Sequence, residues 1–249
     1  MNQTDHQGAT PFCVACQKGY TPIVKCLLQS RHDINIEWVA HPSAGCAGHT
    51  QAGRTALMSA CEHGHASVVE LLLQVLGGIN VNFVEKTVGA SALLLASQEG
   101  QSACVELLLG VSSIDINQLT NSNQTALMMA SYFGREDIVR MLLQRPDINL
   151  DVKSSERGMS ALDCAQKNNY GQIVQLLKDA VVERSVRLLR TIHKEVVVEE
   201  ERVERERKIA GEIELVEADG DDDDDDDDDE EEEEMKMALA LSMSLEKKT

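Results

Sequence analysis

The feature that most constrains this chain is an internal repeat in its first 180 residues. Five segments align in register, and in each a Gly or Asn and one further residue precede a Thr or Ser. These hydroxyl residues are Thr10, Thr55, Ser91, Thr125 and Ser160, so the spacings are 45, 36, 34 and 35 residues. A unit of this length cannot bury an apolar face alone, whereas stacked neighbours can.

Each unit predicts two short helices joined by a tight turn. The hydroxyl is suited to cap the first helix, and a small residue follows where two helices must lie close together. These small residues are Ala15, Ala60, Ala96, Ala130 and Ala165. Four residues later comes a glycine in four units (Gly19, Gly64, Gly100, Gly134) and Asn169 in the fifth. Both residue types suit a left-handed turn. The sequence therefore predicts an all-α solenoid of about five helix–turn–helix repeats with short hairpin loops.

These segments resemble the ankyrin repeat over residues 5–180, with repeats near 8–36, 53–82, 89–117, 123–150 and 158–180. The family's T-P-L-H tetrapeptide survives in part, as TPFC, TALM, SALL, TALM and SALD. Its histidine is absent from every copy, which predicts that the hydrogen bonds it makes between neighbouring repeats are missing. The resemblance implies a non-enzymatic scaffold whose hairpin tips and inner helices bind a protein partner.

Charge is concentrated near the C-terminus. The net charge is −19, and the run 221–234 holds 14 of the 42 acidic residues. The rest of the chain carries 28 acids against 23 bases. This balance predicts repulsion from nucleic acid and from anionic membranes.

No apolar run is long enough for a membrane span, and the N-terminus lacks the pattern of a signal peptide. Seven scattered cysteines suit reduced thiols. We therefore expect a monomeric cytoplasmic or nuclear protein without membrane insertion.

An insertion at 37–52 separates the first two repeats and holds the only tryptophan, Trp38. The favoured interpretation is a loop with Trp38 folded back on the stack. The alternative makes Trp38 an exposed anchor for a protein partner.

The same insertion contains potential metal ligands. His41, Cys46 and His49, together with Cys13 and Cys16, could supply a tetrahedral zinc site. Cys13 and Cys16 occupy helix positions of the repeat, however, where a buried thiol serves as a core residue. A second group, Cys61, His63 and His65, coincides with the turn of the second repeat. We expect no metal, no cofactor and no catalytic residues, since no nucleophile, base and orienting group come together.

From residue 181 to 217 the pattern is a charged, proline-free helical arm. One apolar series could cover the open end of the last repeat: Val182, Val186, Leu189, Ile192 and Val196. A coiled coil is the less favoured alternative, because charged residues interrupt the apolar stripe that would face a second helix.

The last segment is an acidic linker, 218–229, followed by a helix over 230–248. Repulsion between aspartates predicts that the linker is disordered, whereas glutamate favours helix. On a helix Met235, Ala238, Leu239, Ser242 and Leu245 form one stripe. The pattern resembles a ubiquitin-interacting motif, departing only at Leu245, where that motif has an acid. The resemblance implies ubiquitin binding through Glu231, Glu232, Glu233, Glu234, Met235, Ala238, Leu239 and Ser242.

Three alternatives compete for the tail. The terminal helix could instead dock on the repeats as part of the fold. Ile213, Leu215 and Val216, followed by acids, resemble a motif that binds SUMO by adding a strand to its sheet. Residues 195–201 resemble it as well. The acidic run could also bind basic proteins such as histones. The leading interpretation remains an adaptor that binds one protein on its repeats and ubiquitin at its C-terminus.

Overall fold

The computed structural model describes residues 9–29, 53–74 and 79–218, with side chains described as far as residue 210. Within these residues the chain forms ten α-helices, and its one bridge of β type joins Val84 to Ser91. The first helices of the repeats are α1 (Pro11–Gln17), α3 (Ala56–Glu62), α5 (Ala92–Glu99), α7 (Ala126–Tyr132) and α9 (Ala161–Lys167). The second helices are α2 (Thr21–Gln29), α4 (Ala66–Gln74), α6 (Ser102–Leu109), α8 (Glu136–Leu143) and α10 (Gly171–Ala218).

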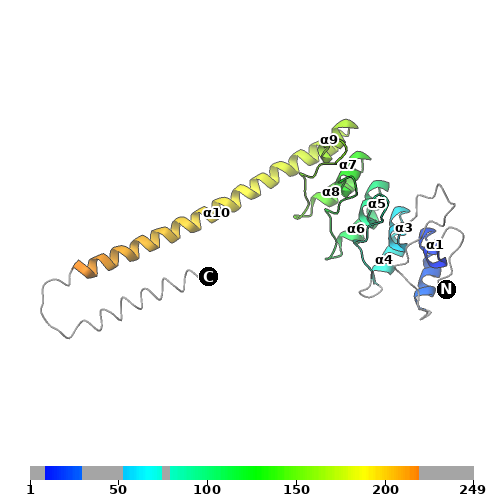
Figure 1. The fold of residues 1–249 in the computed structure, drawn as a ribbon, viewed down its shortest axis with the longest axis horizontal. Helices are drawn as coiled ribbons and strands as arrows, with labels where there is room; N and C mark the ends of the chain where they lie inside the picture. The colour runs from blue at the N-terminus through cyan, green and yellow to red at the C-terminus, as the bar shows by residue number, and fades with distance from the viewer. Residues whose placement is uncertain (1–8, 30–52, 75–78, 219–249) are drawn as a thin grey trace. The chain divides into compact units, whose positions relative to one another are not determined.

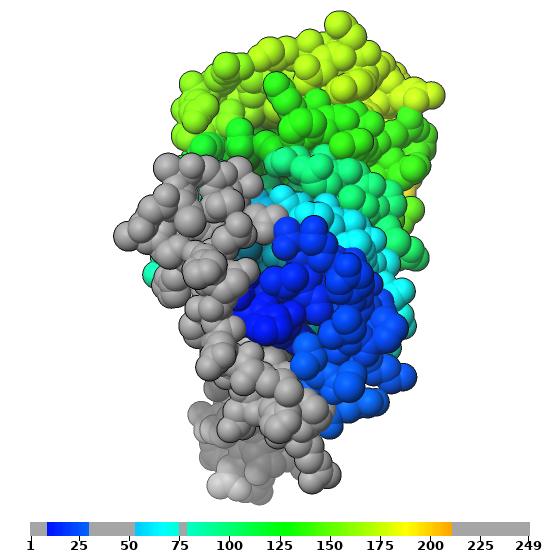
Figure 2. Space-filling model, turned by 90° about the vertical axis from the view of Figure 1, so that its right-hand side faces the viewer, coloured from blue at the N-terminus to red at the C-terminus, as the bar shows by residue number. Residues whose placement is uncertain are grey.

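The helices form two layers, as Figure 1 shows. The first helices contact one another in chain order from α1 to α9, and α2, α4, α6 and α8 form the second row. The colour bands of Figure 2 follow the same order, from the first repeat in blue to the fifth in yellow-green. Leu, Val, Ile, Met and Ala fill the space between the layers, as the low aromatic content requires. The predicted all-α repeat fold is therefore confirmed.

Each first helix begins directly after its predicted hydroxyl residue. Thr10, Thr55, Ser91 and Thr125 accept a hydrogen bond from the backbone N–H three residues later, at 3.2–3.3 Å. Ser160 adds a reciprocal bond with Asp163, which completes a capping box. The five predicted alanines are buried, with at most 4% of their surface exposed. In each repeat, one Thr or Ser thus caps the first helix, and one alanine allows the close contact between helices.

The turns between the two helices have left-handed backbone, as predicted. The four glycines have φ between +71° and +83°, and Asn169 has φ +61°. The residue after the glycine reaches the preceding repeat, and we call this contact a seam. At three seams its side chain binds a backbone carbonyl at the end of the preceding first helix. The pairs are His65 with Gln17, Gln101 with Glu62, and Arg135 with Gln98, at 2.8, 3.3 and 3.1 Å.

The seam bonds come from a position of the repeat for which the sequence predicted no hydrogen bond. The family's histidine is absent, but hydrogen bonds between neighbouring repeats are present and come from another position of the repeat. A carbonyl oxygen only accepts, so the Nε2 atom of His65 carries the proton. At the last seam Asn168 donates to the Tyr132 carbonyl instead, at 3.0 Å. The neighbours are therefore tied together without the tetrapeptide histidine.

The chain divides into two units, residues 1–185 and 186–249. In the first, Ile173 and Leu177 of α10 are buried at 2% exposure and belong to the stack's core. The arm residues 181–217 continue the same helix. The five apolar residues assigned to a cap are exposed, from 39% at Val186 to 65% at Leu189. That this series covers the open end of the last repeat stays a prediction.

The described helices contain no segment with both the length and the apolar content that crossing a bilayer requires.

Candidate protein-binding surface

The hairpin loops between repeats are held in register at their bases by asparagine side chains. Asn82 donates to the Ser113 carbonyl at 2.7 Å and accepts from the Asp115 N–H at 2.8 Å. One repeat later, Asn117 makes the same two bonds, to the Asp147 carbonyl at 2.8 Å and from the Asn149 N–H at 2.7 Å. Because each amide binds both a donor and an acceptor of the next loop, the loops keep a fixed spacing.

The loop between α4 and α5 is organised around a buried carboxylate. Glu85 is 3% exposed and accepts hydrogen bonds from Val88 N–H at 2.6 Å, Thr87 N–H at 2.7 Å and Ala90 N–H at 3.4 Å. Burial raises the pKa of Glu85, but the hydrogen bonds from Thr87, Val88 and Ala90 outweigh it, so the pKa is lowered. The carboxylate is therefore a structural part of the loop.

Uncharged residues occupy this position in the next two loops. Thr120 accepts from the Gln124 N–H through its hydroxyl at 3.0 Å, and Ser154 accepts from the Met159 N–H at 3.1 Å. All three loops thus close with a side chain bound to the backbone near the start of the following helix. Each loop therefore has a side-chain hydrogen bond that holds it to the repeat.

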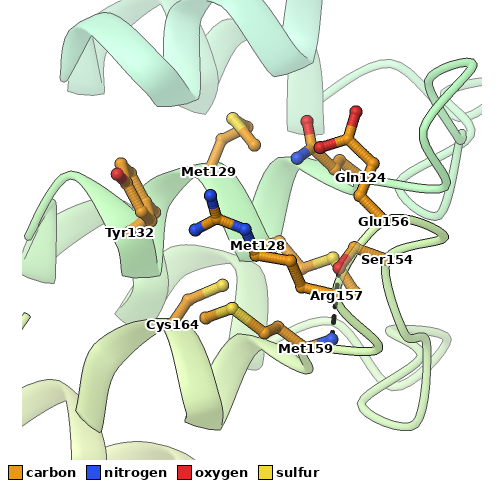
Figure 3. Close-up of a pocket in the computed structure, with 9 residues that line it drawn as sticks. All are labelled: Gln124, Met128, Met129, Tyr132, Ser154, Glu156, Arg157, Met159 and Cys164. Atoms are coloured by element: carbon orange, nitrogen blue, oxygen red, sulfur yellow. Dashed lines mark hydrogen bonds between the residues drawn. The ribbon is translucent and has the colours of Figure 1, made fainter. Parts of the chain in front are cut away.

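A hollow of about 220 Å³ lies between α7, α9 and the loop at 153–159 (Figure 3). Met128, which is 2% exposed, and Cys164, which is 8% exposed, are its most buried lining residues. Met129 and Met159 are partly exposed, and Tyr132 lies at one end of the hollow. Apolar and sulfur-containing side chains therefore surround a space that is open to solvent.

Two charged side chains of the loop also line the hollow. Figure 3 shows the Arg157 guanidinium directed toward the end that holds Tyr132, while the Glu156 carboxylate lies beside Gln124 at the other end. Both residues are exposed. The lining is thus apolar at its base and oppositely charged at its two ends.

The fourth and fifth repeats carry three exposed aromatic residues, of which Tyr132 lines the hollow. Tyr132, Phe133 and Tyr170 are 39%, 40% and 38% exposed, and the rings of Tyr132 and Phe133 meet edge to face at 5.1 Å. The whole chain has only seven Phe, Tyr and Trp residues. Aromatic residues, methionine and arginine are enriched in protein interfaces. The face of the fourth and fifth repeats has that composition.

Reasoning from the sequence missed these residues. Tyr132, Met129 and Arg157 belong to different elements, and no short motif links them. A signal was nevertheless present in the register of the repeat. At its position in the first helix, Tyr132 aligns with Gln17, Glu62, Gln98 and Lys167, which are all polar. An aromatic residue among polar equivalents is the kind of departure that indicates a candidate contact position.

Several predicted site residues lie outside the described part of the chain. These are Trp38 with the insertion at 37–52, and the ubiquitin-binding set Glu231–Glu234, Met235, Ala238, Leu239 and Ser242. The predicted linker from 219 onward falls there too. Ile213, Leu215 and Val216 lie within α10, so their backbone is helical and not extended.

The first group of potential zinc ligands includes two cysteines that are buried in the first repeat. Cys13 and Cys16 are 7% and 0% exposed, and burial raises the pKa of both thiols. Their proposed partners His41, Cys46 and His49 are not among the described residues. Where the chain is described, no three His, Cys, Asp or Glu side chains gather as metal ligands.

The second group is spread over several contacts. His65 lies over Gly19, and the Nδ1 atom of His63 lies 2.9 Å from the Ser59 carbonyl oxygen. Cys61 is completely buried and hydrogen-bonds with Cys104, an interaction that raises the pKa of Cys61 together with burial. His65 and Cys61 therefore contact neighbouring repeats, whereas His63 contacts its own repeat.

Comparison with known families agrees with the geometry. The family model described as ankyrin repeats (3 copies) matches residues 1–85, 37–120, 74–154 and 93–185. A comparison with curated proteins gives no match. The overlapping family matches cover the helix pairs, the left-handed turns and the hairpin loops. The chain belongs to the ankyrin-repeat family, whose stacked repeats form a protein–protein interaction module.

Proposed function

We propose that this protein is a non-enzymatic adaptor, in which the repeats hold one protein and residues 230–248 bind ubiquitin. The repeat family supports the first half of the proposal, because its stacks are interaction modules and typically lack enzymatic activity. The exposed aromatic and methionine side chains of repeats four and five support it further. We further propose that the adaptor acts as a monomer in the cytoplasm or nucleus.

The observation that supports ubiquitin binding is the residue pattern near the C-terminus. An acidic run, Glu231–Glu234, precedes Met235, Ala238 and Ser242 at three- and four-residue spacing. On a helix the small Ala238 would allow close approach, and the acids would meet a basic rim. One short helix buries little area, so the affinity is expected to be on the order of 0.1–1 mM.

Weak binding of this kind is useful only together with a second contact. Once the repeats hold a ubiquitylated partner, the acidic linker keeps the C-terminal segment at a high effective concentration near the attached ubiquitin. The adaptor would then recognise the combination of a protein and its modification.

The test compares the full chain with a chain ending at Gly220 on immobilised ubiquitin. The full chain should be retained and the shorter one lost. Ala238→Asp should abolish retention, because it places a carboxylate at the closest contact. Ala240→Asp, which adds the same charge on another face of the helix, is the matched control. Equal retention of full and shortened chains would exclude ubiquitin binding by this segment.

The alternative is that the acidic tail binds basic proteins such as histones, or SUMO through Ile213, Leu215 and Val216. The Asp221–Asp229 run favours the first of these on charge alone. SUMO binding by strand addition would require α10 to unwind at 213–216, since those residues are helical. Salt separates the cases: binding through the aspartates alone should be lost by about 0.5 M salt, whereas apolar helix contacts should persist.

A further inference from the structure

The hollow between the fourth and fifth repeats has the size of an amino-acid side chain. Its volume is about 220 Å³, below the range of about 300–1,000 Å³ that is usual for sites of small molecules and cofactors. It opens on the same face as the exposed Tyr132 ring. A space of this size and position suits one apolar side chain of a docked peptide better than a free ligand.

Methionine makes the lining adaptable. Met128, Met129 and Met159 all border the hollow. Unbranched thioether side chains fit differently shaped apolar groups at little cost, and they are common at surfaces that bind more than one partner. Leucine and methionine are therefore suitable side chains for the occupant.

The charges of Arg157 and Glu156 favour one orientation of a peptide bound in the hollow. Arg157 forms no hydrogen bond or ion pair with any residue in the described part of the chain, although its guanidinium lies over the hollow. Asp163, the residue before Cys164 in α9, accepts from the Ser160 N–H at 2.8 Å and from the Ser160 hydroxyl at 2.7 Å. Glu156 lies at the opposite end, where it repels an acid. A carboxylate on the occupant would thus be drawn to the Arg157 end.

We propose that this hollow is the primary docking site of the repeats, and that its occupant is an acidic peptide segment of the partner protein. The segment inserts a leucine or methionine between Met129 and Met159, and a carboxylate within about two residues of it binds Arg157. This inference rests on the proposed function, in that the repeats are the part that holds a partner, and it specifies where and by what chemistry.

The experiment is a selection from a display library of random 12-residue peptides on the immobilised full-length protein. The same library is selected in parallel on Arg157→Glu and on Lys178→Glu. Lys178 is exposed on α10 in the same repeat, so its substitution makes an identical change of charge away from the hollow. Peptides that bind the aspartate run are common to all three selections and are subtracted.

The wild type and Lys178→Glu should enrich peptides with a leucine or methionine next to Asp or Glu. Arg157→Glu should lose that class and enrich peptides with Lys or Arg beside the apolar residue. A synthetic peptide from the wild-type class should bind Arg157→Glu at least tenfold more weakly and Glu156→Lys several-fold more tightly. Retention of the acidic class by Arg157→Glu would overturn the assignment.

A second measurement locates the peptide independently of charge. With methionine methyl groups labelled for NMR, the selected peptide should shift the signals of Met129 and Met159. Met58, which is 1% exposed in the second repeat, is the reference and should not shift. Binding with no shift at Met129 and Met159 would place the peptide elsewhere and refute the proposed site, while leaving partner binding by the repeats intact. A selection that enriches no sequence at all would count against both.

Discussion

Two successive seams make equivalent contacts with different residues. One joins the third and fourth repeats, and the other joins the fourth and fifth. In the former, Arg135 does two things: its side chain covers Gly100, and its Nε donates to the Gln98 carbonyl. In the latter, Tyr170 covers Gly134 while Asn168 makes the hydrogen bond.

The difference shows that covering the glycine and bonding the carbonyl are separable tasks. One flexible cation performs both at the earlier seam, whereas a rigid ring and a short amide share them at the later one. Because Asn168 makes the hydrogen bond, Tyr170 is not needed as a donor, and 38% of its surface is exposed. Tyr170 is therefore partly exposed although it covers Gly134, and the hydrogen bond between the repeats is kept by Asn168.

The largest expected effect is at the glycines. In Gly134→Ala, the new Cβ would lie 2.6 Å from the Tyr170 ring, in addition to the strain of φ +71°. We expect a loss of about 3 kcal/mol in the free energy of unfolding, measured with urea. Gly158→Ala is the matched control, since φ is +60° but nothing lies within 4 Å, and it should cost about 1 kcal/mol.

Gly100→Ala should fall between these two variants, because the Arg135 side chain can move aside at the cost of its hydrogen bond. Gly100→Val should cost at least as much. In a Tyr170→Ala background, the cost of Gly134→Ala should drop to that of Gly158→Ala. If it does not, the ring is not what the glycine accommodates.

The next effect concerns the carbonyl bonds. Asn168→Ala and Gln101→Ala each remove the donor to a carbonyl of the preceding repeat, and each should cost about 1 kcal/mol. Tyr170→Phe should cost almost nothing, since Asn168 carries the bond at that seam. Thermal melts of the three variants test the division of tasks, and a clear loss in Tyr170→Phe would refute it.

Two serines in the first helices should respond in the opposite direction. The hydroxyls of Ser97 and Ser131 are buried and have no hydrogen-bond partner among the described residues. Replacing either by Ala removes an unsatisfied polar group and should raise the free energy of unfolding by roughly 0.5–1 kcal/mol. Ser59→Ala is the control, because the Ser59 hydroxyl donates to the Thr55 carbonyl at 3.2 Å. Equal behaviour of all three would mean that the partnerless hydroxyls carry no penalty.

The smallest expected effect is a dependence of the free energy of unfolding on pH, which comes from Glu85 in the loop between α4 and α5. The lowered pKa of Glu85 means that the folded state favours the carboxylate, so its contribution to stability is full above the unfolded pKa of about 4.3 and is lost as pH falls below it. Between pH 5 and pH 3 the wild type should lose more stability than Glu85→Gln. Parallel losses in the two proteins would show that the hydrogen bonds do not favour the charged form.

The sequence predicted what depends on single positions. Each of these features depends on one residue type at one position of the repeat. They are the helix caps at the five Thr and Ser residues, the left-handed turns at four glycines and Asn169, and the buried alanines. The seam donors could not be predicted in this way, because His65, Gln101 and Arg135 share a position but not a chemical type. Only the close approach of the next repeat shows that all three reach the same carbonyl.

The hollow and the arm were hidden for related reasons. The hollow forms where side chains of two repeats and a loop meet, so Arg157 and Met129 acquire a joint meaning only in three dimensions. In the arm, periodicity correctly placed apolar residues on a helix, but it carries no information on whether anything covers them. Leu177 and Leu189 of α10 are the same residue type, yet 2% and 65% exposed.

The buried cysteines allow the local unfolding of individual repeats to be measured. Cys16, Cys61 and Cys104 lie in three successive repeats and are at most 1% exposed, whereas Cys26 is exposed. An alkylating reagent reaches a buried thiol only when the surrounding repeat opens. Because each repeat is stabilised mainly by its neighbours, opening is easiest at the ends. The order in which these cysteines react is therefore a direct reading of how the solenoid comes apart.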